Sequence, residues 1–231
     1  MAPQLTNDRT EQSVRIALSD GVIEGNLTLP DATQAVVLFA HGSGSSRFSP
    51  RNRYVADVLH DAGMGTLLID LLTREEERVD MSTGHLRFDI DFLADRLVAA
   101  TDWLGKNPVT KNFRIGYFGA STGAAAALVA ASMRPAVWAI VSRGGRPDLA
   151  GHALPVVHAA VLLLVGGNDR QVLELNRDAY RKLHRARARE LQVIPGASHL
   201  FEEPGTLEEV ARLAAHWFRH SLMGAAETEA R

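Results

Sequence analysis

Three residues far apart in the sequence have the types and surroundings of a nucleophile, its base and an orienting acid. Residues 119–123 read Gly-Ala-Ser-Thr-Gly and fit the pattern G-x-S-x-G, in which a sharp strand-to-helix turn exposes a serine hydroxyl. A serine hydroxyl is a poor nucleophile at neutral pH, so it needs a base within hydrogen-bond reach and an acid that orients this base. Chains that use this turn follow the order serine, acid, histidine. We therefore predict Ser121 as the nucleophile, Asp169 as the acid and His199 as the base.

Each of these assignments has an alternative. A chain of this length matches G-x-S-x-G by chance about one time in ten, and a serine before a helix can simply cap it. The surroundings of Ser121 favour the nucleophile, because an apolar segment precedes it and an alanine-rich helical segment follows. Asp148, after another predicted strand, is the alternative acid, whereas Asp70 precedes the serine and is expected to anchor its loop. Most other histidines fall within predicted helices or at the wrong end of a strand, and His85 stays open as an alternative base.

Cleavage of an acyl compound also needs N–H donors for the negative oxygen of the tetrahedral intermediate. We expect one donor from Thr122, the residue after the predicted nucleophile. The second is expected from a glycine-containing loop, where Ser43 is favoured and Gly42 or Gly44 are the alternatives. His41, which ends the preceding strand, is expected to support this loop through hydrogen bonds. The loop lacks the third glycine of G-x-G-x-x-G and the Gly-Lys-Ser/Thr of a P-loop, which argues against a nucleotide site.

Two arginines follow a later predicted strand. Arg143 and Arg146 are candidates for binding a carboxylate or phosphate group of the substrate, together with Gly42 and Gly44 of the glycine-containing loop. An ion pair with the nearby Asp148 is the simpler interpretation of these arginines. The basic residues between positions 177 and 189 are interpreted as an exposed helix face, since a single tyrosine lies among them and the whole chain is slightly acidic.

These residues can act together only if the fold brings them to one place. Apolar strand patterns alternate with helical ones, which predicts a mainly parallel sheet with helices on both faces. Ligands bind such sheets at the carboxyl ends of the strands, where the candidate loops fall. Strands are predicted at 14–18 and 22–29, as an opening antiparallel hairpin, and at 35–40, 66–71, 113–119, 137–142, 159–165 and 191–194. Helices are predicted at 49–61, 88–104, 122–133, 172–186 and 207–222.

Composition narrows the class of protein. The chain has 231 residues, 46% of them hydrophobic, and no internal repeat or linker, so we predict one domain over 1–231 with flexible ends at 1–12 and 223–231. A net charge of −2 gives no field that would attract nucleic acid or an anionic membrane. The absence of cysteine excludes a thiol nucleophile and a thiolate metal site, and no H-E-x-x-H pattern occurs.

The start of the chain lacks the basic and apolar regions of a signal peptide, and the longest apolar runs are too short to cross a bilayer. We therefore expect a cytoplasmic protein that acts on small molecules, with neither nucleic acid nor a membrane as a partner.

Four short motifs occur in a characteristic order: HGSGSS at 41–46, GASTG at 119–123, GGND at 166–169 and GASH at 196–199. Together they resemble the α/β-hydrolase superfamily and, more narrowly, its dienelactone-hydrolase-like branch, and similar stretches occur in hydrolase domains attached to phosphoribosyltransferases. The likeness runs from about residue 36 to the final helix. It implies an α/β-hydrolase fold with seven to eight strands, no large cap domain, and hydrolysis without a metal or other cofactor.

The resemblance implies a carboxylesterase-type serine hydrolase that works through an acyl-enzyme. Dienelactone hydrolase itself uses cysteine where this chain has Ser121, which favours a general esterase over an enzyme for dienelactones. Large lids in this fold often enter between the strands predicted at 137–142 and 159–165, and only residues 143–157 lie there. We therefore predict a lightly covered pocket for small or soluble acyl substrates. Residues 73–84 are predicted to form a charged loop, and the segment 72–85 that contains it can reach over the site. The alternatives are a thioesterase, amidase or acyltransferase, or a non-catalytic domain that works with a phosphoribosyltransferase.

Overall fold

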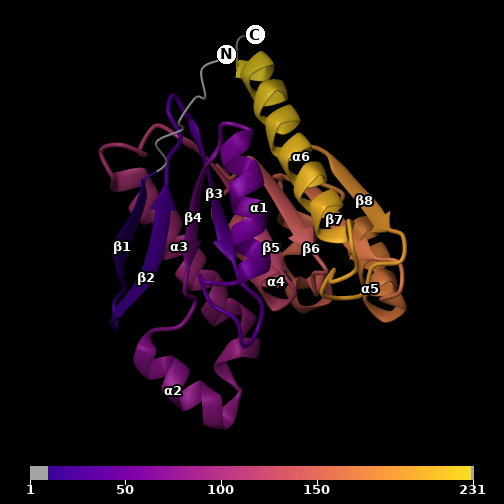
Figure 1. Cartoon of the computed structure of the whole chain (residues 1–231), viewed down its shortest axis with the longest axis horizontal. Coiled ribbons are helices and arrows are strands. Elements are labelled where there is room, and N and C mark those ends of the chain that lie inside the picture. Colours follow the sequence, from indigo (N-terminus) through magenta and orange to yellow (C-terminus); the bar gives the residue numbers. More distant parts are fainter. Residues whose placement is uncertain (1–9, 230–231) are drawn as a thin grey trace, which may run out of the picture.

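A computed structural model describes residues 10–229, with side chains for residues 10–222, and an eight-stranded sheet runs through it (Figure 1). The strand order is β1-β2-β4-β3-β5-β6-β7-β8. The first two strands are antiparallel to their neighbours, and β3 to β8 all run parallel. The strands are β1 (Glu11–Ala17), β2 (Val22–Thr28), β3 (Ala35–Ala40), β4 (Gly65–Ile69), β5 (Arg114–Ala120), β6 (Ala139–Arg143), β7 (Ala160–Gly166) and β8 (Arg189–Ile194). The predicted α/β-hydrolase fold with an opening hairpin is confirmed.

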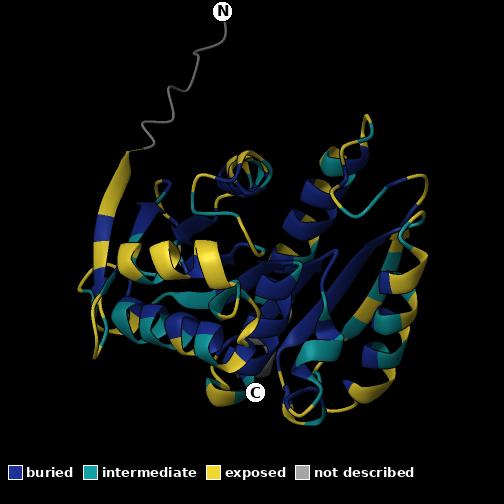
Figure 2. Cartoon of the chain, turned by 90° about the horizontal axis from the view of Figure 1, so that it is seen from below, coloured by how far each residue is buried: buried dark blue, intermediate teal, exposed yellow. Residues whose placement is uncertain are grey.

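Helices cover both faces of this sheet. One face packs against α1 (Pro50–Asp61) and α6 (Thr206–Glu229). The other face packs against α3 (Ile90–Lys106), α4 (Thr122–Met133) and α5 (Arg170–Lys182). Short 3-10 helices lie at η1 (Leu86–Phe88), η2 (Pro147–Ala150) and η3 (Leu154–Val156). Figure 2 shows the buried sheet between helices whose outer faces are exposed.

The alternation of side chains along each buried strand builds two apolar cores. In β3, Val36 and Leu38 point to the core under α3 and α4, while Val37 and Phe39 point to the core under α1 and α6. Helix α4 is buried along nearly its whole length, which its run of alanines permits because small side chains allow close packing on the sheet. This central packing fixes the start of α4 at the carboxyl edge of the sheet.

Helix α2 (Arg74–Thr83) replaces the loop predicted at 73–84, and it lies beyond the carboxyl edge of the strands (Figure 1). The prediction was wrong because α2 buries only Asp80 and therefore has no apolar periodicity. A local signal was present in the sequence. The Thr73 hydroxyl accepts a hydrogen bond from the Glu76 N–H (3.2 Å), the Glu76 carboxylate accepts one from the Thr73 N–H (2.7 Å), and Gly84 ends the helix at φ 68°. This is a capping box, and such boxes mark helix starts without any apolar pattern.

The two ends of the chain also differ from expectation. Residues 11 and 12, expected to be flexible, form the start of β1, where Glu11 pairs with Thr28 and its carboxylate accepts a hydrogen bond from the Asn26 amide (2.9 Å). Helix α6 continues to Glu229, through a segment rich in the strong helix formers alanine and glutamate. The remaining parts of the predicted flexible ends, residues 1–9 and 230–231, lie outside the described residues. In the part that the structure describes, no helix is both long and apolar enough to cross a membrane.

Candidate active site

Ser121 occupies a strained turn between β5 and α4. Its backbone has φ 50° and ψ −120°, a left-handed conformation that costs a non-glycine residue about 1–3 kcal/mol. The glycines on either side are required by close approaches. A Cβ at Gly119 would lie 2.4 Å from the Cα of Ala124, and one at Gly123 would lie 2.4 Å from the carbonyl oxygen of Ala40. The surrounding backbone therefore holds the serine in the predicted exposed turn.

The end of β6 and the loop after it bind both backbone groups of Ser121. The N–H of Ser121 donates to the carbonyl of Arg143 (3.2 Å), and the N–H of Arg146 donates to the carbonyl of Ser121 (3.1 Å). Asn176, fully buried on α5, donates from its amide to the carbonyl of Gly145 (3.0 Å). Asn176 thus ties the loop that positions Ser121 to α5. No local pattern could have identified Asn176, because an asparagine inside a helix has no motif of its own.

Two further loops bring a histidine and an aspartate to Ser121. The Nε2 of His199 lies 3.4 Å from the Oγ of Ser121, and its Nδ1 lies 2.6 Å from the Oδ2 of Asp169. These loops, after β7 and β8, pack so closely that a Cβ at Gly166 would lie 2.4 Å from the carbonyl oxygen of Ala197. The structure therefore brings together the three residues predicted as nucleophile, acid and base.

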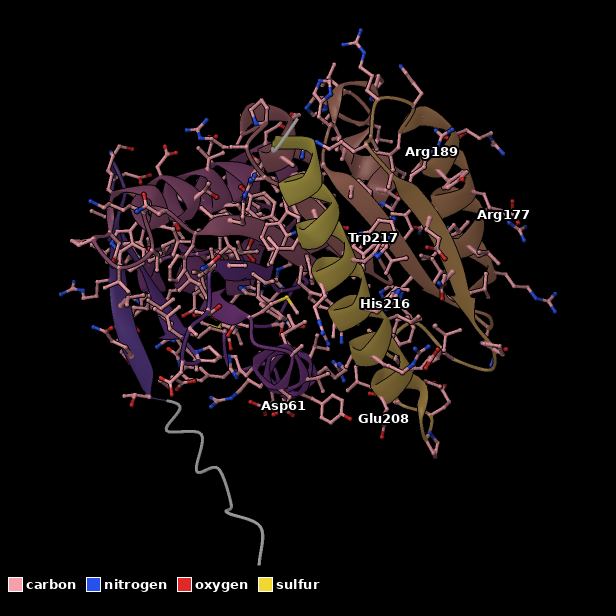
Figure 3. The ribbon with its side chains drawn as sticks, turned by 90° about the horizontal axis from the view of Figure 1, so that it is seen from above. Asp61, Arg177, Arg189, Glu208, His216 and Trp217 are labelled. Carbon is pink, nitrogen blue, oxygen red and sulfur yellow. The ribbon has the colours of Figure 1, made fainter. Side chains whose placement is uncertain are left out.

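The alternative acid and base lie in other contacts. Asp148 accepts two hydrogen bonds from the guanidinium of Arg146 (2.9 and 2.7 Å), the ion pair that was the simpler interpretation of this arginine. His85 is exposed and contacts the hydroxyl of Thr83 at the end of α2 (2.8 Å). Arg177 points outward from α5 and pairs with Glu174, as expected of an exposed helix face (Figure 3). Among the described residues, no group of three or more histidine or acidic side chains is arranged to hold a metal ion.

The loop after β3 is held by His41, as expected, and also by Asp70, which was expected to anchor its own loop after β4. The N–H of Leu71 donates to Nε2 of His41 (3.1 Å), so Nδ1 carries the proton and donates to the carbonyl of Gly42 (2.9 Å). Burial lowers the pKa of His41, which favours this neutral form. Asp70 accepts a hydrogen bond from the N–H of Arg47 (2.8 Å) and forms an ion pair with its guanidinium.

The predicted oxyanion donors lie at the same corner. A Cβ at Gly42 would lie 3.2 Å from the Cβ of Ser121, so this loop runs directly beside the serine. Thr122 is the first residue of α4, where a backbone N–H has no partner within the helix. The N–H of Ser43 donates to the Thr122 hydroxyl (3.0 Å), which ties the loop to the start of α4. Gly44 follows at φ 69°.

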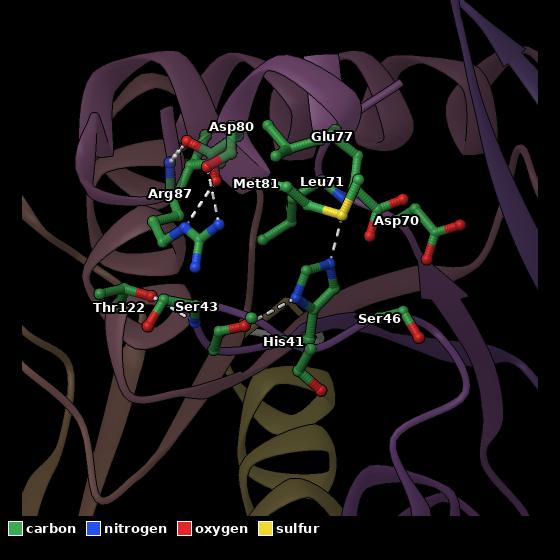
Figure 4. A pocket seen from close by; sticks show the side chains of 15 residues that line it. His41, Ser43, Ser46, Asp70, Leu71, Glu77, Asp80, Met81, Arg87 and Thr122 are labelled. Carbon is green, nitrogen blue, oxygen red and sulfur yellow. Dashed lines mark hydrogen bonds and ion pairs between the residues drawn. The ribbon is translucent and has the colours of Figure 1, made fainter. Parts of the chain in front are cut away.

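A pocket of about 250 Å³ opens between this loop and α2 (Figure 4). Its walls include Ser43 and Thr122 on one side and Met81 and Arg87 on the other. The segment between β6 and β7 contains only η2 and η3 and forms no cap. The segment that was expected to reach over the site as a loop does border the pocket, but it forms helix α2.

Asp80 fastens α2 to the segment that follows it. Its carboxylate is 3% exposed and accepts hydrogen bonds from the N–H of Leu86 (2.7 Å), the N–H of Arg87 (3.2 Å) and the Nε of Arg87 (2.6 Å). Burial raises the pKa of Asp80, but the hydrogen bonds and charge of Arg87 and the N–H of Leu86 outweigh it, so the pKa is lowered. The ionised carboxylate therefore stabilises the packing of α2 against residues 86–88.

We predict that Asp80→Asn accelerates amide hydrogen exchange in residues 74–88 by about tenfold or more at pH 7, because it removes charge-assisted hydrogen bonds. The lowered pKa means that this contribution is complete above the ordinary value of 3.8 and is lost as the pH falls through the folded value. The variant and the wild type should thus converge in strongly acid solution. The control is Glu75→Gln, which removes the charge of an exposed α2 carboxylate that forms an ion pair with Arg78. It should change the exchange rates by less than about twofold, because exposed ion pairs contribute little to stability. Equal exchange in both variants would contradict the role of Asp80.

Comparison with known proteins agrees with the fold and the motifs. Residues 23–222 match the model of the dienelactone hydrolase family. The chain is 54% identical over 215 residues to a curated protein of Mycobacterium tuberculosis H37Rv that carries the provisional name phosphoribosyl transferase Rv0571c. That match covers 93% of this chain and 47% of the relative, so the chain spans about half the length of the curated relatives it matches.

Solved structures give the same result. The chain is similar to a dienelactone hydrolase from Anabaena variabilis, with 59% identity, a TM-score of 0.89, and coverage of 92% of this chain and 98% of the other. An esterase from Pyrococcus furiosus, Pf2001, shares the fold at 19% identity with a TM-score of 0.76, covering 92% of this chain and 93% of its own. The family match spans most of the sequence, and the chain belongs to the dienelactone hydrolase family.

Proposed function

We propose that this protein is a serine hydrolase that cleaves carboxylic esters through an acyl-enzyme, with Ser121, His199 and Asp169 as its catalytic triad. The observation that carries this proposal is the hydrogen-bonded series from the Ser121 hydroxyl through the His199 ring to the Asp169 carboxylate, with separations of 3.4 and 2.6 Å. Membership of a hydrolase family supports hydrolysis as the reaction class. A dienelactone hydrolase and an esterase among the similar structures support an ester as the substrate.

In the first step, Oγ of Ser121 attacks the ester carbonyl carbon while Nε2 of His199 accepts the hydroxyl proton. The carbonyl π electrons move to the oxygen, which then carries a negative charge. The N–H groups of Thr122 and of Ser43 or a neighbouring glycine bind this oxygen. For Ser43 this requires its N–H to turn from the Thr122 hydroxyl or to share its hydrogen bond. The intermediate then expels the alcohol, whose oxygen takes the proton held by His199.

In the second step, water replaces the alcohol and is deprotonated by His199. Its oxygen attacks the acyl carbon, and the acid leaves as Ser121 recovers its proton. Asp169 accepts the Nδ1–H of His199, so Nε2 is left free to accept protons. Neither step requires a metal or another cofactor.

The pocket supports a small or soluble acyl group. A volume of about 250 Å³ beneath α2 holds a short chain or a single ring more readily than a long lipid. A serine nucleophile favours a general carboxylic ester over a dienelactone, although a dienelactone hydrolase is 59% identical to this chain.

Two alternatives remain for the reaction. Thioester, amide or acyl-transfer chemistry could use the same three side chains, and rates on matched ester, thioester and amide substrates separate these activities. The provisional name of the Mycobacterium tuberculosis relatives supports a non-catalytic role beside a phosphoribosyltransferase. The close contacts of Ser121, His199 and Asp169 favour catalysis, since a binding role alone would not require them.

The direct test is covalent labelling with a fluorophosphonate probe, followed by mass spectrometry of the peptides. We expect one phosphonate per chain, on Ser121, because such probes react with serines activated by a neighbouring base. Heat-denatured protein serves as the control and should take up no label. A label on another serine, or none on the folded protein, would refute the proposed mechanism.

A further inference from the structure

Arg143, the last residue of β6, holds a positive charge inside the protein. The residue is 7% exposed. Along β6, Ala139 and Val141 point to the core under α1 and α6, so Arg143, two residues further on, points to the same face. The Arg143 side chain therefore lies beneath the carboxyl edge of the sheet, on the side of α1 and α6.

No group among the described residues neutralises this charge. The guanidinium of Arg143 makes no hydrogen bond or ion pair with them, and its Nη1 is fully buried. Burial, with the charge of Arg51 as a smaller cause, lowers the pKa of Arg143 to about 10, so it is still charged at pH 7. Arg96 is equally buried but pairs with Asp20 (3.2 Å) and Glu76 (2.5 Å). A buried charge without a partner is costly, and a bound anion would remove this cost.

The start of α1, which covers the same face of the sheet as the Arg143 side chain, offers further donors. Pro50 has no N–H, and the hydroxyl of Ser49 accepts the hydrogen bond of Asn52 (3.3 Å), so the N–H of Arg51 is left for an external acceptor. The Nε of Arg51 is also buried without a partner in the described part of the chain. Its Nη1 contacts Glu202 (3.3 Å), a carboxylate that is 63% exposed. The only carboxylate that contacts this group of donors among the described residues is therefore the exposed one of Glu202, and it contacts Arg51 rather than Arg143.

This cluster lies next to the proposed catalytic residues. The carbonyl of Arg143 accepts the N–H of Ser121, and a Cβ on Gly144 would lie 3.0 Å from the carbonyl oxygen of His199. Glu202, which Arg51 contacts, follows His199 by three residues. The donors are therefore on the His199 side of the nucleophile, where the alcohol of an ester receives its proton.

We propose that Arg143, Arg51 and the N-terminus of α1 form a subsite that binds a phosphate group on the alcohol part of the substrate. This proposal rests on the proposed ester hydrolysis. A phosphate monoester presents three terminal oxygens and a charge of about −1.5 to −2. Arg143 offers five N–H donors, and Arg51 adds its Nε–H and its backbone N–H. A carboxylate has two oxygens, which the fork of one arginine satisfies. Because Arg143 and Arg51 both have buried nitrogens without a partner among the described residues, the donors come from two side chains and suit the three oxygens of a phosphate better than the two of a carboxylate.

Three matched esters test this subsite: acetylglycerol, acetylglycerol phosphate and acetylglycerate. We expect kcat/KM to be about 10- to 100-fold higher for the phosphate ester than for the neutral ester. Arg143→Met should bring this ratio close to one, whereas Arg177→Met, which removes the same charge from the exposed face of α5, should preserve it. A higher rate on acetylglycerate than on acetylglycerol phosphate, or an unchanged ratio in Arg143→Met, would overturn the proposal.

A thermal melt gives a second readout that needs no catalysis. Without phosphate, Arg143→Met should melt about 2–8 °C above the wild type, because an apolar side chain replaces an unpaired buried charge. Inorganic phosphate at about 10 mM should raise the melting temperature of the wild type and leave that of Arg143→Met unchanged. A lower melting temperature for the variant would assign Arg143 a structural role instead.

Further outcomes separate the subsite from the enzyme. If Arg143→Met does not fold, Arg51→Met, at a side chain that is 36% exposed, should still reduce the phosphate preference severalfold, and an unchanged preference would overturn the proposal. Esterase activity with no response to phosphate would refute the subsite and leave the proposed function intact. A melting temperature that rises with phosphate, in a protein without any esterase activity, would refute the proposed function and leave the phosphate site intact.

Discussion

Ser121→Ala should lower kcat on a small activated ester such as p-nitrophenyl acetate by about 100,000-fold or more. The variant loses the group proposed to form the acyl-enzyme, since Oγ of Ser121 is the atom that Nε2 of His199 contacts. The remaining rate comes from N–H donors that still polarise the carbonyl. Steady-state kinetics, with titration of active sites to exclude wild-type carry-over, measures the effect.

The fold should survive this substitution. Alanine keeps the Cβ, so the strain at φ 50° is unchanged, and the hydroxyl of Ser121 caps no helix N–H. We expect a melting temperature within about 2 °C of the wild type. Ser132→Ala, near the other end of α4, removes a hydroxyl bonded to the carbonyl of Val129 and should change kcat less than about twofold. Full activity in Ser121→Ala, or a comparable loss in Ser132→Ala, would rule out the serine mechanism.

Asp169→Asn should lower kcat by about 10,000-fold while the variant stays folded. The carboxylate of Asp169 accepts the Nδ1–H of His199 at 2.6 Å and so leaves Nε2 free to take the proton of Ser121. An asparagine amide can instead donate to Nδ1, which moves the ring proton to Nε2 and prevents this transfer. Comparison of kcat and KM should show the loss almost entirely in kcat.

Asp148→Asn is the matched control, because Asp148 was the other acid compatible with the order of the chain. Its carboxylate is held by Arg146 at 2.7 and 2.9 Å, so its loss should change kcat less than about threefold. A larger loss in Asp148→Asn than in Asp169→Asn would reverse the assignment of the acid.

Prediction from the sequence succeeded where the signal was local. The turn at Ser121 is specified by its own glycines and by the strand and helix patterns on either side, and the hairpin and the parallel strands follow from short apolar runs. It failed at α2, where burial of a single residue left no periodicity to detect. The capping box at Thr73 and Glu76 was the signal that could have identified this helix.

The sequence by itself determined the order along the chain of the strands and of every α-helix except α2, the turn that exposes Ser121, and a short set of candidate acids and bases. Only the tertiary structure shows which of these candidates lie together. The contact of His199 with Asp169 and the unpaired burial of Arg143 depend on where separate loops meet at the edge of the sheet. Hydrogen bonds act over about 3 Å, whereas the partners here are 30 to 79 residues apart in the chain, so their pairing is set by the packing of the whole sheet rather than by any local pattern.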